Sequence, residues 1–247
     1  MSFDEFKSYI LEEIQKYVKE NNRQDIKLDD SQINDLYIYM KELIEWNEKI
    51  NLTAIIEPKE VVVKHFIDSL TSLEYVGVDD SIIDVGTGGG FPGNILAIGL
   101  KNGNNKITLL DSLNKRIIFL DQMIEQLKLN NVNTIHGRAE DYGQDINYRE
   151  KYSIAISRAV APLNVLLEYL SAFVKVGGRV ICMKGPNIVN ELADANKAIS
   201  KLGLELEKED NFTLEGNERN IIVFKKVKKL EKIYPRKAGL PSKNPIK

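Results

Sequence analysis

The sequence predicts an α/β fold with a mostly parallel seven-stranded sheet, preceded by a small helical unit. Three observations lead to this prediction. Apolar runs of strand length alternate with helical patterns from about residue 79 onward, a glycine-rich segment follows the first run, and a short polar turn separates the last two. Alternating strands and helices are typical of a parallel sheet covered on both faces, and a terminal hairpin adds an antiparallel edge strand.

The N-terminal unit is expected to contain three helices, because apolar side chains recur there at helical intervals. Ser2 and Glu5 have the spacing of a capping box. Ser31 is the expected N-cap of the second helix, and Pro58 is a favourable first residue for the third. The expected ranges are 2–20, 31–47 and 58 to about 75.

Strands and helices are expected to alternate in the rest of the chain. The strand-like runs lie at 82–85, 106–110, 132–136, 152–157, 178–183, 204–213 and 219–225. The helical patterns lie at 94–100, 113–129, 162–174 and 188–202. The segment 215–218 is expected to turn the last two strands into a hairpin.

Composition excludes several classes of protein. The 247 residues are 43% apolar and 28% charged, which is typical of a soluble globular protein. No apolar run approaches the ~20 residues that span a bilayer. The acidic N-terminus does not resemble a signal peptide. The single cysteine, Cys182, cannot form an internal disulfide, so a cytoplasmic location is expected.

Charge is distributed unevenly along the chain. Residues 1–80 carry 9 basic and 18 acidic side chains, whereas residues 225–247 carry 9 basic and 1 acidic side chain. Clustered positive charge favours a polyanionic partner such as nucleic acid. The alternative for this end is a solvated tail.

The most informative segment, residues 82–93, reads Ile-Ile-Asp-Val-Gly-Thr-Gly-Gly-Gly-Phe-Pro-Gly. A strand ends there in glycines, and a helix follows. Glycine adopts positive φ and lets the backbone approach a ligand, while the helix start presents free N–H groups. Asp84 and Asp111 lie at the ends of neighbouring strands. Together these features predict a site for a cofactor that contains a nucleoside.

The glycine spacing also matches the dinucleotide fingerprint, so an NAD site is an alternative. Two features favour S-adenosylmethionine. Asp84 lies just before the first glycine, Gly86. The terminal hairpin is typical of the class I S-adenosylmethionine-dependent methyltransferase fold, which is Rossmann-like. The chain also shows no second domain for a reducible substrate.

Each candidate residue has an expected role in such a site. Gly86 and Gly88 would approach the methionine part of the cofactor, and Asp111 would accept hydrogen bonds from the ribose hydroxyls. Glu140 and a neighbouring backbone N–H would read the adenine edge. Arg158, at the end of the fourth strand, would pair with a carboxylate or phosphate. The alternatives are a helix cap for Asp111, a surface charge for Glu140 and a structural ion pair for Arg158.

The sequence also restricts the methyl acceptor. Cys182 lies in a buried-strand pattern and is not expected to act as the nucleophile that C5 methylation of a pyrimidine needs. Residues 157–160 read Ser-Arg-Ala-Val, where enzymes that methylate exocyclic amines commonly carry Asp/Asn-Pro-Pro-aromatic. A ring nitrogen or a ribose oxygen remains. Guanine N7 carries no proton, so its methylation requires positioning and not a general base.

The chain contains only two histidines. His65 lies one helical turn from Asp68 and Ser69, which would orient it, although a core position is the alternative. His136 is expected to be structural. With a single cysteine as well, the wide spacing predicts no metal site.

Several segments together resemble the RsmG family, also called glucose-inhibited division protein B, of small-subunit ribosomal RNA guanine-N7 methyltransferases. They are Trp46–Thr53, His65–Leu70, Asp84–Gly93, Asp111–Arg116, Gly137–Glu140, Ser157–Ala161, Gly185-Pro186 and Tyr234–Pro241. The resemblance implies cofactor contacts at Gly86, Phe91, Ala139, Glu140 and Arg158. It also implies one modified guanine, at position 527 of 16S ribosomal RNA. Gly89-Gly90-Phe91 departs from the commoner family pattern, which places the affinity for the cofactor in doubt.

The resemblance suggests an extended basic arm that orders on RNA, since prolines 235, 241 and 245 prevent a long helix. The acidic N-terminal unit is expected to shape the pocket beside the cofactor. The candidate substrate contacts are Asn51, His65, Asp68, Lys184 and Arg236, with Asn47 as a further possibility.

These inferences divide the chain into a helical unit (1–78), a methyltransferase domain (79–227) and a basic arm (228–247). The expected partner is 16S ribosomal RNA, in the small subunit or an assembly intermediate, bound by a monomer without a metal or a membrane. Two rival functions remain: a non-catalytic RNA-binding protein of the same fold, and an NAD-dependent oxidoreductase.

Overall fold

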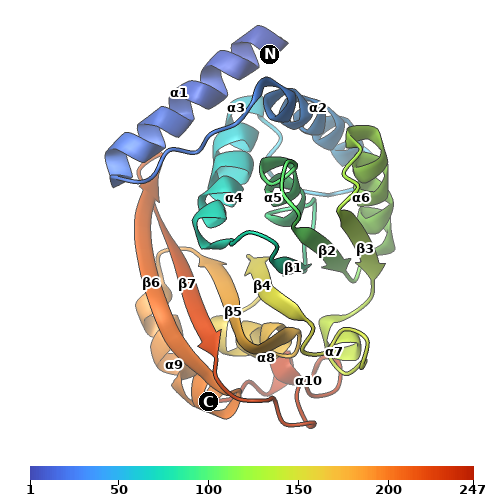
Figure 1. Cartoon of the computed structure of the whole chain (residues 1–247), viewed down its shortest axis with the longest axis vertical. Helices are drawn as coiled ribbons and strands as arrows, with labels where there is room; N and C mark the ends of the chain where they lie inside the picture. Colours follow the sequence, from blue (N-terminus) through green and yellow to red (C-terminus); the bar gives the residue numbers. More distant parts are fainter.

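Seven strands form one sheet in the order β3-β2-β1-β4-β5-β7-β6 (Figure 1). The computed structural model describes all 247 residues. The strands are β1 (Ser81–Val85), β2 (Lys106–Asp111), β3 (Val132–His136), β4 (Tyr152–Arg158), β5 (Val174–Lys184), β6 (Leu204–Leu214) and β7 (Asn217–Lys226). The first five pair in parallel, whereas β7 runs antiparallel to both β5 and β6. The predicted parallel sheet with a closing hairpin is therefore confirmed.

Helices cover both faces of this sheet. They are α1 (Phe3–Asn21), α2 (Asp30–Asn47), α3 (Pro58–Val61), α4 (Asp68–Leu70), α5 (Gly93–Gly99), α6 (Asn114–Leu127), α7 (Ala139–Tyr142), α8 (Leu163–Ser171), α9 (Ile188–Lys201) and α10 (Leu240–Lys243). Successive strand residues point to opposite faces. Ile82 thus packs with α1, α2, α5 and α6, whereas Ile83 packs with α8 and α9. The short helices α7 and α10 have no counterpart in the sequence prediction.

The N-terminal helices pack into the same hydrophobic core as one face of the sheet. Phe6, Leu36 and Phe66 are fully buried and belong to one cluster with Ile82. The expected capping box of α1 is present. The N-cap of α2 is Asp29, whose carboxylate accepts from the Gln32 amide while the Gln32 side chain accepts from the Asp29 amide, so the prediction of Ser31 was wrong.

The third N-terminal helix changes its winding along its length. Four segments follow one another: α3, a π-helical segment (Val62–Ile67), α4 and a 3₁₀ segment (Thr71–Tyr75). The expected range is confirmed, and the structure adds that the winding is not that of a regular α-helix. The π-helical segment contains His65, and such segments are frequent at functional sites.

The basic C-terminal residues fold back against α7 and α8 instead of extending from the protein. Leu230, Pro241 and Ile246 are buried. The side chain of Arg149 donates to the carbonyls of Gly143, Leu230, Glu231 and Tyr234, and that of Gln144 donates to the carbonyls of Lys232 and Pro235. The prediction of an extended arm was therefore wrong, because side chains of the preceding domain hydrogen-bond to the backbone of this segment and hold it against the protein.

No helix in the structure is both long enough and apolar enough to cross a bilayer.

Candidate functional site: two neighbouring cavities

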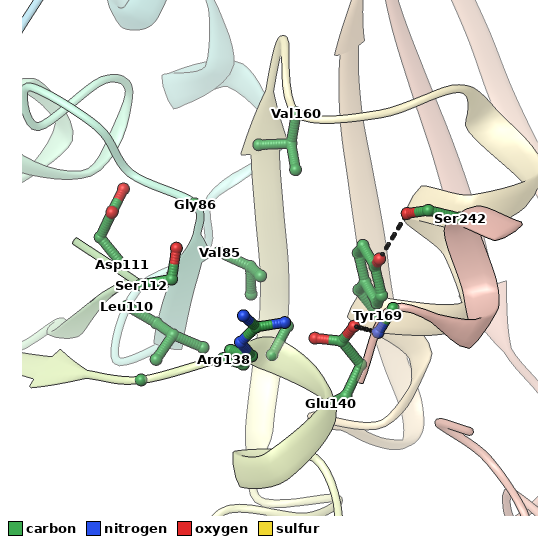
Figure 2. A pocket seen from close by; sticks show the side chains of 13 residues that line it. Val85, Gly86, Leu110, Asp111, Ser112, Arg138, Glu140, Val160, Tyr169 and Ser242 are labelled. Atoms are coloured by element: carbon green, nitrogen blue, oxygen red, sulfur yellow. Dashed lines mark hydrogen bonds between the residues drawn. The ribbon is translucent and has the colours of Figure 1, made fainter. Parts of the chain in front are cut away.

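The first cavity lies at the carboxyl ends of β1, β2 and β3, where open α/β sheets bind their ligands. Its volume is about 340 Å³, within the range of small-molecule sites. Figure 2 shows how its side chains converge. The lining residues are Val85, Gly86, Leu110, Asp111, Ser112, Gly137, Arg138, Ala139, Glu140, Val160, Tyr169, Gly239 and Ser242.

Gly86 turns the chain out of β1 and into the glycine loop. Its φ is +73°, and its N–H donates to the carbonyl of Leu110 at 2.8 Å. A Cβ at this position would lie 2.6 Å from Cγ2 of Val160. Both the backbone angle and the close contact require glycine here, as expected for a loop that brings its backbone to a ligand.

Asp111 ends β2 and is almost completely buried. One carboxylate oxygen accepts from the amide of Leu113 at 2.9 Å, and the other accepts from the amide of Gly88 at 2.9 Å and from Arg116 at 3.2 Å. An ionised carboxylate has about four acceptor positions, so this one retains capacity for ribose hydroxyls. Asp111 also connects the glycine loop to the start of α6.

Glu140 lies in α7, on the opposite side of the first cavity from Asp111 (Figure 2). It is 8% exposed, and its Oε1 accepts from the amide of Gly239 at 2.9 Å. It is therefore not the surface charge that was its alternative. Arg138 precedes it, lines the same cavity and is exposed.

Three lining residues were missed by sequence reasoning: Tyr169 of α8, and Gly239 and Ser242 of the C-terminal segment. The Tyr169 hydroxyl lies 3.1 Å from the Ser242 hydroxyl. The Tyr234–Pro241 motif could have indicated the C-terminal pair. Tyr169 gives no such signal, because it lies within an apolar helix that reads as core.

Asp84, Gly88 and Phe91 lie outside the lining of the first cavity. The buried Asp84 carboxylate accepts from the amide of Gly93 at 2.8 Å and so holds the start of α5 against β1. Burial raises the pKa of Asp84 to about 6, although the Gly93 amide acts in the opposite direction. Asp84 thus stabilises the glycine loop by connecting the end of β1 to the start of α5, and it does not line the cavity.

The second cavity lies at the carboxyl ends of β4 and β5 and has a volume of about 350 Å³. The third N-terminal helix, the ends of β4 and β5, helix α9, strand β6 and the start of β7 all contribute to its lining. Its lining residues are Ile55, Lys64, His65, Asp68, Arg158, Ala159, Met183, Lys184, Gly185, Glu191, Phe212, Arg219, Asn220 and Ile221.

Arg158 belongs to this second cavity and not to the first. Its guanidinium donates to the Asp68 carboxylate at 2.6 Å, to the carbonyl of Lys64 at 2.9 Å and to Nδ1 of His65 at 3.0 Å. Arg219 approaches the other Asp68 oxygen at 3.4 Å. The structural ion pair considered for Arg158 is therefore present, and it joins β4 to the N-terminal unit.

His65 is buried and neutral. Arginine can only donate, so Nδ1 accepts from Arg158 and Nε2 carries the proton, which it donates to the Thr53 hydroxyl at 2.7 Å. Burial, together with the positive charge of Arg158, lowers the pKa of His65 to about 3. Its ring stacks on Phe91 at 4.2 Å between centroids. Thr53 and Arg158 thus orient this ring, where Asp68 and Ser69 were expected.

The remaining substrate candidates separate into two groups. Lys184 lines the second cavity, where its ammonium donates to Glu191 at 2.7 Å and to the carbonyl of Ala161 at 2.9 Å. Asn51 and Arg236 line neither cavity. Asn51 is exposed, and Asn47 accepts from the amides of Leu52 and Thr53.

The single cysteine and the second histidine lie outside the lining of both cavities. Burial raises the pKa of the Cys182 thiol to about 12. His136 is exposed, and its Nε2 lies 3.2 Å from the carbonyl of Ser112. The structure contains no cluster of three or more residues suited to hold a metal ion.

Solved structures with the same architecture define the class of the protein. The tRNA methyltransferase TrmK of B. subtilis superposes with a TM-score of 0.53 at 12% identity, covering 68% of each chain. TYW2 of M. jannaschii in complex with AdoMet superposes with a TM-score of 0.51 at 17% identity, covering 66% of this chain and 76% of that one. The sheet order and these likenesses identify the class I S-adenosylmethionine-dependent methyltransferase fold.

Sequence comparison then identifies the family. The model of the family GidB, rRNA small subunit methyltransferase G, matches residues 32–222. Proteins called ribosomal RNA small subunit methyltransferase G are 53% identical over 90% of this chain in Alkaliphilus oremlandii and 46% identical over 94% of it in Oenococcus oeni. The matches cover 94% and 96% of those proteins. The chain belongs to the rRNA small subunit methyltransferase G family.

Proposed function

We propose that this protein transfers the methyl group of S-adenosylmethionine to N7 of one guanine in 16S ribosomal RNA. The observation that carries the proposal is the adjacency of two cavities at the carboxyl edge of one sheet. The two cavities meet at three consecutive residues after β4. Arg158 and Ala159 line the second cavity, and the next residue, Val160, lines the first. A methyl transfer requires donor and acceptor sites held side by side.

The first cavity suits the donor. Asp111 offers a carboxylate to the ribose hydroxyls, and Glu140 offers one to the adenine amine. Gly86 exposes its backbone to the methionine part, because no side chain covers it. The volume of about 340 Å³ is sufficient for a nucleoside cofactor.

The second cavity suits a nucleotide acceptor. Lys184, Arg158 and Arg219 provide positive charge for the phosphate groups of RNA. Asp68 and Glu191 provide negative charge, which offsets the positive charge that the purine acquires on methylation. His65 remains neutral near pH 7 and adds no charge.

The proposed chemistry does not require a catalytic dyad. S-adenosylmethionine supplies a methyl group on a positively charged sulfur, and the N7 lone pair forms the new bond as the carbon–sulfur bond breaks. No proton moves in this step. The protein's own residues therefore need only align the base, exclude water and balance the charge.

The proposed substrate form follows from the family. Its relatives are called small-subunit rRNA methyltransferases, so we propose the small ribosomal subunit or an assembly intermediate as the partner of a cytoplasmic monomer. Residues 79–227 would form the catalytic domain, and residues 1–78 would complete the acceptor side.

A transfer assay tests the proposal. Purified protein is incubated with methyl-labelled S-adenosylmethionine and with either 16S RNA or small subunits from a strain that lacks this gene. We expect label in N7-methylguanosine, identified by mass spectrometry of nucleosides and mapped to the single predicted guanine. Asp111→Asn should abolish transfer by weakening the donor site. Asp121→Asn, on the exposed face of α6, is the matched control and should retain it.

The transfer assay, together with measurements of RNA binding and of cofactor binding, separates the rival functions. Label in another atom or nucleotide would contradict the proposed acceptor. RNA binding without transfer would indicate a non-catalytic RNA-binding protein. Calorimetric binding of NAD, but not of S-adenosylmethionine, would indicate an oxidoreductase.

A further inference from the structure

The C-terminal segment forms part of the wall of the first cavity. Gly239 and Ser242 both line it, and Figure 2 shows Ser242 on the side opposite Asp111 and Gly86. They lie about 100 residues after Glu140 in the chain, so only folding brings them to the site.

Two adjacent residues of α8 hold this segment on either side of Gly239. Glu168 is fully buried and accepts from the Arg236 amide at 2.8 Å, from Nε at 2.9 Å and from the terminal guanidinium nitrogen at 2.6 Å. Tyr169 contacts Ser242. The ion pair raises the pKa of Arg236, so its charge is retained throughout the physiological range. The backbone of Gly239 is thereby fixed between two anchors.

The fixed backbone of Gly239 is hydrogen-bonded to Glu140. Its N–H donates to one oxygen of the Glu140 carboxylate at 2.9 Å, and the other oxygen lies on the side of Arg138, which also lines the cavity (Figure 2). Gly239 has a φ of +80°, an angle that side-chain-bearing residues rarely adopt. The direction of this N–H therefore depends on glycine.

We propose that residues 236–242 are a positioning element for the cofactor. They close the wall of the nucleoside compartment and hold the Glu140 carboxylate so that its free oxygen accepts from the exocyclic amine of adenine. This inference rests on the proposed function of the first cavity. It assigns to the basic C-terminal segment a role in binding the methyl donor, where the sequence suggested only a contact with RNA.

The observed hydrogen bond from Gly239 to Glu140 and the proposed one from adenine to Glu140 also predict that cofactor binding is coupled to the order of the C-terminal segment. One carboxylate would bind the C-terminal segment through Gly239 and the cofactor through its amine. Ordering of the segment in advance removes an entropic cost of binding, so loss of the segment should weaken cofactor affinity without removing any residue of the glycine loop.

Calorimetry with S-adenosylhomocysteine and its deaminated analogue, S-inosylhomocysteine, tests the proposal. Gly239→Ala should weaken binding of S-adenosylhomocysteine about tenfold. The preference for the adenine form over the inosine form should also fall, because the Glu140 carboxylate is no longer held. Gly216→Ala is the matched control, since Gly216 has a φ of +70° and similar open space but lies in the β6–β7 turn. It should bind both ligands like the wild type.

A second variant keeps the test decisive if Gly239→Ala does not fold. Ser242 is exposed, so Ser242→Ala removes its hydroxyl contact with little effect on the core, and it should weaken binding about two- to threefold. Wild-type affinity and wild-type adenine preference in the folded variants would overturn the inference. A wild-type protein that binds neither ligand would instead overturn the proposed function of the cavity.

Discussion

The two ends of the chain complete different cavities and are held by different forces. The acidic N-terminal unit supplies Lys64, His65 and Asp68 to the second cavity, and it is fixed by apolar packing on one face of the sheet. The basic C-terminal segment supplies Gly239 and Ser242 to the first cavity. Polar side chains of the domain, including Arg149 and Glu168, fix its backbone.

This difference indicates how each end responds to change. Apolar packing shared with the sheet makes the N-terminal unit part of the cooperative core. The C-terminal segment buries only a few side chains, such as Leu230 and Ile246, and its backbone is held by hydrogen bonds, so we expect it to open while the sheet remains folded. The second cavity is therefore expected to be rigid, and the first cavity is expected to have a wall that can open separately.

Removal of one buried side chain from the N-terminal core should have the largest effect on the free energy of unfolding. Phe66 is fully buried between the helices and the sheet, so Phe66→Ala should lower the free energy of unfolding by about 3–5 kcal/mol. Urea unfolding followed by circular dichroism should show one transition, shifted as a whole. Ile56→Ala, at a 53% exposed position, should change the same free energy by less than about 0.5 kcal/mol. A separate early transition of the helices would contradict a shared core.

Loss of the buried carboxylate that anchors the C-terminal segment should have a local effect. Glu168→Gln should lower the free energy of opening of residues 230–246 by about 2–3 kcal/mol, because Arg236 loses its ionic partner. Hydrogen exchange should become faster in that segment while the protection of β1 and β4 is retained. Glu231→Gln, at an exposed position in the same segment, is the control. Equal loss of protection throughout the protein would contradict separate opening.

The acid sensitivity of the N-terminal unit should depend on His65. Its pKa in the folded protein is about 3, below the value of about 6.5 in the unfolded chain, so its contribution is present above pH 6.5 and is lost as pH falls toward 3. Between pH 7 and pH 5 this loss amounts to about 2 kcal/mol. In His65→Gln the fall in unfolding free energy should be smaller by that amount. His136→Gln should follow the wild type, and identical pH profiles for all three proteins would show that His65 does not titrate as described.

The smallest expected change in free energy concerns the glycine loop. Gly86→Ala should weaken binding of S-adenosylhomocysteine by about tenfold, or ~1.4 kcal/mol, because the new Cβ meets Val160 and the backbone angle is strained. Gly177→Ala carries similar strain in open space and should bind normally. Isothermal titration calorimetry measures both variants. Unchanged affinity in Gly86→Ala would place the cofactor elsewhere.

Local patterns predicted most of the fold and part of the site. The strands, the main helices and the closing hairpin were predicted within a few residues, because side-chain periodicity and turn residues are local properties. Asp111, Glu140 and Gly86 were also predicted for one site, since the carboxyl ends of parallel strands meet at one edge. The third helix was predicted in position but not in winding, which depends on its packing.

The sequence by itself determined the order of elements and the family of the protein, and it predicted a nucleoside site at the glycine loop. Only the tertiary structure decided that Arg158 pairs with Asp68 in a second cavity, and that the basic C-terminal segment closes the first one. These contacts join residues that are 68 to 99 positions apart, and two of the three involve a backbone N–H. Such contacts leave no periodicity in the sequence, because any chain segment offers the same N–H and C=O groups.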